Sequence, residues 1–201
     1  MLFCYFRISL YSYLFLGNKK CALRITGKYV RVLEGIMYMS YAIVYSSRTG
    51  NTELLAHTIE SSLDASECVY SGPLDDKALE ADTIYCGFWT FKGTCDAKVE
   101  AFLGQCHDKN LFLFGTCGYG KDPAYQQQII DRVAACVGAD NQLIGSYMCQ
   151  AKMPMSVRDR YVSLKESGQA PDNIDDLIEN FDEALSHPDD ADLTRLASLL
   201  A

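Results

Sequence analysis

The segment YAIVYSSRTGNTELLAHTIES, residues 41–61, sets small polar side chains between an apolar run and a helical pattern. The run 42–45 predicts a buried strand, and Leu55, Ile59 and Leu63 recur at helical spacing. The corner between these elements holds four side-chain donors and one glycine, namely Ser47, Thr49, Asn51, Thr52 and Gly50. Backbone N–H groups and the positive end of a helix dipole converge on such a corner. This pattern predicts a phosphate-binding site.

The corner lacks the lysine of a nucleotide-triphosphate loop, and no G-x-G-x-x-G occurs there. A terminal phosphate monoester therefore suits it better than a triphosphate. The alternative is an ordinary capped turn between a strand and a helix. The side chain of Arg48 either contacts the phosphate or faces solvent, and we favour solvent.

The elements that must position this corner alternate along the chain after Met39. Apolar runs predict five strands, and amphipathic stretches predict helices between them. The strands are expected at 42–45, 67–70, 83–88, 111–115 and 143–148, and the helices around 52–63, 99–103, 123–137 and 174–185. The segment 71–81 is expected to form only a turn or a helix fragment. This alternation predicts one domain with a parallel sheet and helices on both faces.

The sequence SRTGNTE, Ser47–Glu53, resembles the phosphate loop S/T-x-T-G-N-T of the flavodoxin family. The resemblance extends over about residues 40–185 in strand and helix order. It implies an α/β, three-layer αβα sandwich whose five-stranded parallel sheet has the order 2-1-3-4-5, with FMN across the carboxyl ends of the strands. It further implies that the FMN phosphate is held by the side chains of Ser47, Thr49, Asn51 and Thr52 and by the backbone N–H groups of Arg48 and Gly50.

The same resemblance places the flavin ring between the loops after the third and fourth strands. The first of these, CGFWTFKGT, supplies Trp89, Thr90, Phe91 and Gly93, and the second, GTCGYGKDPAY, supplies Thr116, Cys117, Gly118 and Tyr119. By analogy, the peptide at Gly93 would flip on reduction of the flavin. Trp89 is either a stacking partner or a core aromatic, and Tyr119 either stacks on the ring or faces solvent.

Two departures from short flavodoxins stand out. The first ring loop carries Lys92 and no acid before Asp96, and a cation there would raise the potential of the second electron. A long segment, 148–173, also precedes the predicted last helix. It covers the flavin or a partner surface through Met153, Pro154 and Met155, or it packs as a loop with a short helix. This segment and the ending NFDEALSHPD resemble a bacterial flavodoxin subgroup, some of whose members are associated with bile-pigment reduction.

The first 38 residues differ in charge from the rest. Residues 1–38 hold six cations and one anion, a net of +5, whereas residues 39–201 hold twelve cations and twenty-five anions, a net of −13. The apolar run 8–17 is too short to span a bilayer. We expect 1–38 to be a disordered or over-annotated extension, with the native start at Met37 or Met39, and 39–201 to be the FMN-binding domain.

An acidic domain disfavours nucleic acid and suits basic protein partners. The nine cysteines have no metal-ligand spacing and indicate free thiols in a reducing cytoplasm. No catalytic residue and no metal ligand are predicted. The sequence therefore favours an FMN-dependent electron carrier between a basic-surfaced reductase and an acceptor redox protein. The alternative is an FMN-dependent NAD(P)H/quinone-type reductase that acts directly on a small substrate.

Overall fold

The computed structural model describes residues 21–25, 28–33, 36–120 and 122–200, in two units that divide after Met39. In the first unit, β1 (Cys21–Ile25), β2 (Lys28–Leu33) and β3 (Ile36–Tyr38) pair antiparallel in chain order. The sequence pattern did not indicate these strands. The run 8–17 lies outside the described residues, and a native start at Met37 or Met39 stays a prediction.

The second unit is built on one parallel sheet of five strands. These are β4 (Tyr41–Tyr45), β5 (Cys68–Pro73), β6 (Thr83–Trp89), β7 (Asn110–Cys117) and β8 (Gln142–Gln150). They lie in the order β5-β4-β6-β7-β8, and every neighbouring pair is parallel. Counted from β4, this order is 2-1-3-4-5, which confirms the predicted topology and fold class.

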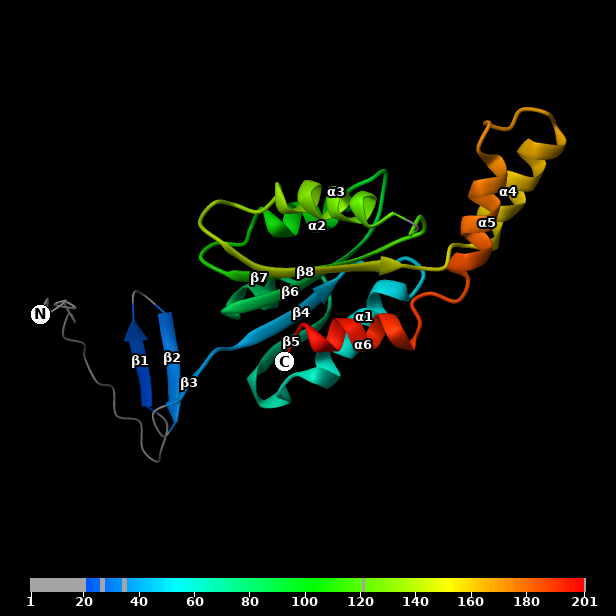
Figure 1. Cartoon of the computed structure of the whole chain (residues 1–201). Coiled ribbons are helices and arrows are strands. Elements are labelled where there is room, and N and C mark those ends of the chain that lie inside the picture. The colour runs from blue at the N-terminus through cyan, green and yellow to red at the C-terminus, as the bar shows by residue number, and fades with distance from the viewer. Residues whose placement is uncertain (1–20, 26–27, 34–35, 121, 201) are drawn as a thin grey trace, which may run out of the picture. The chain divides into compact units, whose positions relative to one another are not determined.

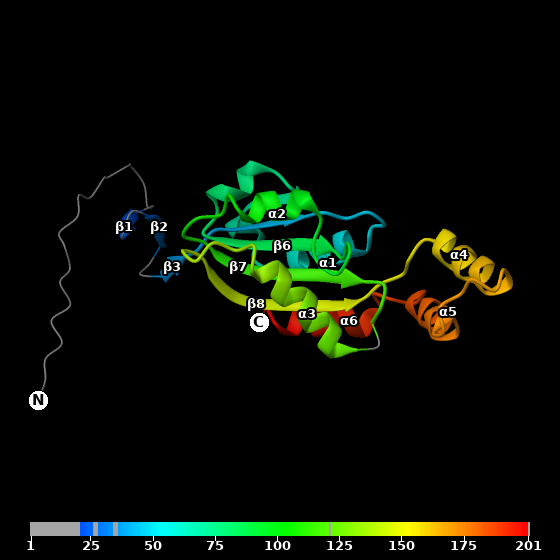
Figure 2. The ribbon, with the colours of Figure 1, turned by 90° about the horizontal axis from the view of Figure 1, so that it is seen from above.

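Helices cover both faces of this sheet (Figures 1 and 2). One face packs α1 (Asn51–Ser62) and α6 (Asp190–Ser198). The other packs α2 (Ala97–Leu103), α3 (Pro123–Ala134) and the short 3₁₀ helix η2 (Asp76–Glu80), which is the predicted fragment between β5 and β6. The side chains of β4 alternate between the two cores, so the strand is buried on both faces.

The end of the chain differs from the sequence-based prediction. The predicted last helix is α5 (Ile174–Ala184), but it pairs with α4 (Met155–Glu166) in a hairpin that extends beyond the carboxyl end of β8 (Figure 1). The helix that covers the sheet beside α1 is α6, which the sequence analysis missed. The predicted helical pattern stops at residue 185, shortly before Pro188, whereas Asp189 caps a further helix directly after this proline.

Two glycines let aromatic rings lie flat against the sheet. A Cβ on Gly87 would come within 2.4 Å of the Phe114 ring, and one on Gly115 within 2.6 Å of the Phe88 ring. Both rings are fully buried.

All seven cysteines whose side chains the structure describes are free thiols. Within the described part of the chain, no helix has the length and apolar character needed to cross a membrane.

Candidate functional site

A cavity of about 280 Å³ opens at the carboxyl ends of β4, β6 and β7. Eight of the predicted site residues line it: Arg48, Thr49, Asn51, Trp89, Thr90, Thr116, Cys117 and Gly118. The other predicted residues, Ser47, Gly50, Thr52, Phe91, Gly93 and Tyr119, stand outside the lining. The fold therefore brings the three predicted loops to one place.

The β4–α1 corner has the geometry that a phosphate requires. Gly50 is the N-cap of α1, has a φ of +83°, and provides no side-chain cap. The first N–H groups of a helix have no intrahelical partner, so those at Asn51 and Thr52 are available to an anion. The hydroxyl of Ser47 accepts a hydrogen bond from the N–H of Glu53 at 3.4 Å. The N-cap residue thus leaves the start of α1 uncapped, and Ser47 reaches only the N–H of Glu53, the third residue of the helix.

Two polar side chains of this corner are bonded within the protein. Asn51, which is buried, donates to Oγ1 of Thr49 and to the carbonyl of Lys152, both at 2.9 Å. The Thr52 hydroxyl is buried against Oγ1 of Thr116 at 3.1 Å. These bonds hold the loop in shape and link it to β7 and to the segment after β8. Contact between these side chains and a phosphate stays a prediction.

The first ring loop turns sharply after Trp89. Phe91 and Thr94 pair through both backbone hydrogen bonds, and Lys92 and Gly93 between them both have a positive φ. This is typical of a type I′ turn. The carbonyl of Gly93 accepts from Nη1 of Arg132 at 3.0 Å, so a peptide flip at Gly93, which stays a prediction, would have to break that bond.

Asp96 accepts hydrogen bonds from Trp89 in the first ring loop and from Ser46 directly after β4. The sequence analysis did not single out this residue as functional. Its Oδ2 accepts from Nε1 of Trp89 at 2.8 Å and from Oγ of Ser46 at 2.5 Å. Its Oδ1 caps α2 through the N–H groups of Lys98 and Val99. An acid three residues before an apolar helix position is a recognisable cap signal, but nothing in the sequence pairs it with Trp89 and Ser46.

A side chain of α5 forms hydrogen bonds with the second ring loop. Asn180, which is 2% exposed, donates to the carbonyl of Gly118 at 2.9 Å and accepts from the N–H of Gly120 at 3.3 Å. The Cys117 thiol donates to the carbonyl of Tyr119 at 3.0 Å, and burial raises the pKa of this thiol to about 12. Cys117 is therefore a neutral wall of the cavity at physiological pH. Tyr119 is 40% exposed and stands edge-on to Tyr125.

The segment joining β8 to α4 forms a wall of the cavity that was not assigned to the site from the sequence. The cavity is lined by four residues of this segment, Ala151, Lys152, Met153 and Pro154, and by Ser156 and Val157 in the first turn of α4. Met153 lies so close to Gly118 that a Cβ on this glycine would come within 2.3 Å of the Met153 sulfur. The sequence analysis left open whether this segment covers the flavin, and the structure places its start against the cavity.

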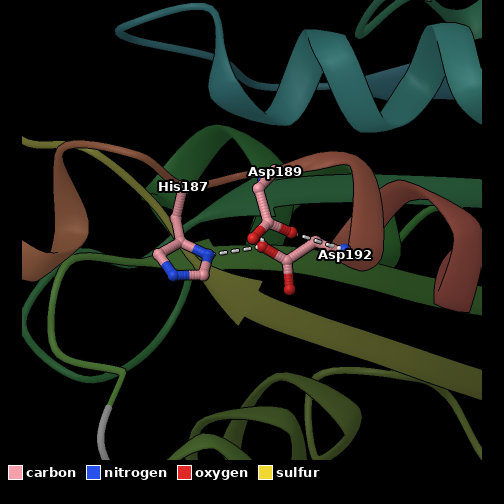
Figure 3. A group of neighbouring side chains, drawn as sticks. All are labelled: His187, Asp189 and Asp192. Atoms are coloured by element: carbon pink, nitrogen blue, oxygen red, sulfur yellow. Dashed lines mark hydrogen bonds and ion pairs between the residues drawn. The ribbon is translucent and has the colours of Figure 1, made fainter.

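One cluster outside the cavity has side chains that could suit a metal. The ligand atoms of His187, Asp189 and Asp192 lie within 4.8 Å of one another (Figure 3). Asp189 and Asp192, however, form a reciprocal capping box at the start of α6, and Nδ1 of His187 lies 2.6 Å from Oδ2 of Asp192. We therefore assign these three residues to capping α6.

The residues of the cavity fit FMN in their chemistry. The uncapped N-terminus of α1 suits the phosphate, and the indole of Trp89 and the thioether of Met153 offer apolar surface to the ring. Met153 and the segment around it would shield one side of the bound group. A bound FMN would supply one-electron and two-electron redox chemistry.

Comparison with known proteins agrees with this geometry. The family model "Flavodoxin domain" matches residues 42–201. A flavodoxin-like domain-containing protein BilS of Clostridium symbiosum (strain WAL-14163) is 37% identical over 179 residues, covering 81% of this chain and 94% of the relative. A protein of the same name from Clostridioides difficile (strain CD3) is 29% identical over 159 residues, covering 77% and 90%.

These relatives agree with the predicted resemblance to the subgroup associated with bile pigments. Among solved structures, a flavodoxin from the domain Archaea superimposes with a TM-score of 0.45 at 16% identity, over 80% of this chain and 93% of that one. The assignment rests on the family model and on the relative that is 37% identical. The chain belongs to the flavodoxin domain family.

Proposed function

We propose that this chain is an electron carrier that holds FMN in the cavity and passes electrons from a separate reductase to an acceptor protein. Membership of the flavodoxin family supports FMN as the cofactor. One observation carries the choice of a carrier: no residue lining the cavity, within the described part of the chain, is His, Asp or Glu. The three ionisable lining residues are Arg48, Lys152 and the neutral thiol Cys117. The described lining therefore offers no carboxylate or imidazole that could act as a general acid or base on a substrate.

The surface supports a protein partner. The net charge of −13 over residues 39–201 would steer a basic-surfaced reductase and acceptor toward the chain, and it disfavours nucleic acid. Three apolar side chains are exposed near the cavity: Phe91 in the first ring loop, Tyr119 in the second ring loop and Met155 at the start of α4. Such residues are suited to a brief contact with another protein close to the flavin. The free thiols favour a cytoplasmic location.

A second function, direct reduction of a small molecule such as a quinone by NAD(P)H, is favoured by one different observation. The β8–α4 segment and the first turn of α4 form one wall of the cavity with Met153, Pro154 and Val157, and such a wall can enclose a substrate beside the ring. The subgroup resemblance makes this alternative worth testing with bile pigments as well as with quinones.

One experiment separates the two functions. The FMN-loaded protein is incubated with NADPH and a quinone, first alone and then with a separate flavin reductase, and NADPH consumption is followed. The carrier predicts no consumption by the protein alone and turnover when the reductase is added. Steady consumption by the protein alone would establish the direct reductase instead. A protein that fails to retain FMN would refute both.

A further inference from the structure

The carboxylate of Asp96 uses both of its oxygens to join three separate elements. Oδ2 accepts from the indole of Trp89, at the end of β6, and from the hydroxyl of Ser46, directly after β4. Oδ1 accepts from the first turn of α2. A single side chain therefore fixes the position of the first ring loop relative to the start of the phosphate loop.

The indole of Trp89 contacts two other side chains besides Asp96. The guanidinium carbon of Arg48 lies 5.6 Å from the centre of the indole, and the Phe91 ring lies 5.5 Å away from it. Both neighbours are exposed side chains, so neither fixes the rotation of the indole about its χ2 angle. The bond from Nε1 to Asp96 does, because it specifies the direction in which one edge of the ring points.

The carboxylate is in the ionised form that this role requires. Burial acts to raise the pKa of Asp96, but hydrogen bonds from Ser46, from the N–H groups of Val99 and Lys98, and from Trp89 together lower it below the ordinary value. An ionised carboxylate only accepts hydrogen bonds, and those it accepts are stronger than neutral ones.

We propose that Asp96 is a positioning residue of the FMN site: its carboxylate holds the Trp89 indole in the orientation in which the indole lines the cavity and stacks beside FMN. This inference rests on the proposed function only in naming FMN as the group beside the indole. The bond between Asp96 and Trp89 is a property of the protein without its cofactor.

The test uses the single tryptophan of the chain. In the full-length apoprotein, collisional quenching of Trp89 fluorescence by acrylamide is compared between wild type and Asp96→Asn. An asparagine keeps an oxygen for capping α2 but places an amide N–H₂ opposite the indole N–H. We expect the quenching constant to rise about twofold, since the indole then becomes mobile. The control is Asp122→Asn, because Asp122 caps α3 in the same manner without touching the indole.

FMN affinity then supplies a double-mutant cycle of Asp96→Asn and Trp89→Phe. The wild type, both single variants and the double variant are each titrated with FMN. We expect Asp96→Asn to weaken binding about tenfold when Trp89 is present, the effect of one charge-assisted hydrogen bond, and less than about threefold when phenylalanine replaces it.

The outcomes are distinct. An equal loss of affinity in both backgrounds, or quenching that does not change, would show that Asp96 acts through Ser46 or through the cap of α2 and not through the indole. Either result would overturn the inference while leaving the proposed function intact. If the wild type fails to bind FMN, the proposed function falls, and the assignment of Asp96 to an FMN site falls with it.

Discussion

At the scale of single residues, the site depends on a backbone conformation that side chains seldom adopt. Gly50 is in the left-handed region at a φ of +83°, and no atom lies within 4 Å of where its Cβ would be. An alanine at this position meets no clash, so any effect of the substitution arises from the backbone alone. The left-handed conformation costs an alanine about 1–2 kcal/mol.

We predict that Gly50→Ala lowers the free energy of unfolding by about 1 kcal/mol and weakens FMN binding by about tenfold, because a shift at the N-cap moves the phosphate-facing N–H groups. Urea denaturation and FMN titration measure the two effects. Gly168→Ala is the matched control, since Gly168 also has a positive φ, +71°, and open space around it, at the end of α4. It should lose similar stability with unchanged affinity. Equal affinity losses in both variants would contradict the role of Gly50.

Asp96 should also give the protein a specific sensitivity to acid. Its folded-state pKa lies below its ordinary value of 3.8, so its contribution is fully present above that value and is lost as the pH falls through the folded pKa. We predict that wild type is more stable than Asp96→Asn at neutral pH and that this difference shrinks below about pH 4. Denaturation midpoints measured between pH 7 and pH 2.5 provide the check, and a difference that does not depend on pH would contradict it.

Lys92 offers a redox prediction. Its Nζ lies over the Phe91 ring, 5.2 Å from the ring centre, in the turn after Trp89. We predict that Lys92→Glu lowers the midpoint potential of the second electron by on the order of tens of millivolts, because a negative charge then replaces a positive one near the flavin. Lys109→Glu is the control, because Lys109 directly precedes the amino end of β7, whereas the cavity lies at the carboxyl ends of the strands. An unchanged potential in a redox titration of Lys92→Glu would show that Lys92 is remote from the ring.

At the scale of elements, α5 supports the site through Asn180 rather than by covering the sheet. Beyond its bonds to Gly118 and Gly120, the Asn180 Oδ1 also accepts from Nε2 of Gln150 at 3.1 Å. The hairpin of α4 and α5 is itself linked by Arg158 with Asp182 and by Lys165 with Asp175. Hydrogen bonds of Asn180 therefore connect the helical hairpin to the second ring loop and to the end of β8.

We predict that Asn180→Ala lowers the free energy of unfolding by about 1–3 kcal/mol, since it leaves partly buried backbone groups of the loop without their Asn180 partner. It should also weaken FMN binding, because Gly118 lines the cavity. Chemical denaturation and FMN titration measure these effects. Asn173→Ala is the control, as Asn173 precedes α5 on the surface and makes no capping bond. Unchanged behaviour of Asn180→Ala would refute this support of the loop.

At the scale of the whole molecule, the uneven charge is the property that bears on partners. The strongly acidic composition of residues 39–201 would attract basic proteins over a distance set by the ionic strength. We predict that the reduced, FMN-loaded protein transfers electrons to cytochrome c, a basic acceptor, at a rate that falls about tenfold or more between 10 and 300 mM NaCl. Stopped-flow absorbance at several salt concentrations measures this rate. A rate independent of salt would exclude electrostatic steering.

The sequence by itself determined the alternation of strands and helices and the polar corner after β4, while the strand order followed from the resemblance to the flavodoxin family. Apolar runs 42–45, 83–88 and 111–115 lie within central strands whose burial on both faces leaves little alternative, and the corner is local because its residues fall within six positions. Similarly, the helix expected around 99–103 is α2, and its apolar residues Val99, Phe102 and Leu103 are its buried ones.

Only the tertiary structure decided which distant residues meet. Asp96 and Ser46 are 50 positions apart, Asn180 and Gly118 are 62 apart, and Asn51 and Lys152 are 101 apart. Each of these bonds includes a residue from a loop at the carboxyl ends of the parallel strands, where segments distant in sequence meet. Hydrophobic periodicity reports the direction in which an element faces, but it does not report which polar group lies opposite. For that reason, only the folded structure revealed the cavity wall formed by the β8–α4 segment, the bonds from α5 to the second ring loop, and the bond between Asp96 and Trp89.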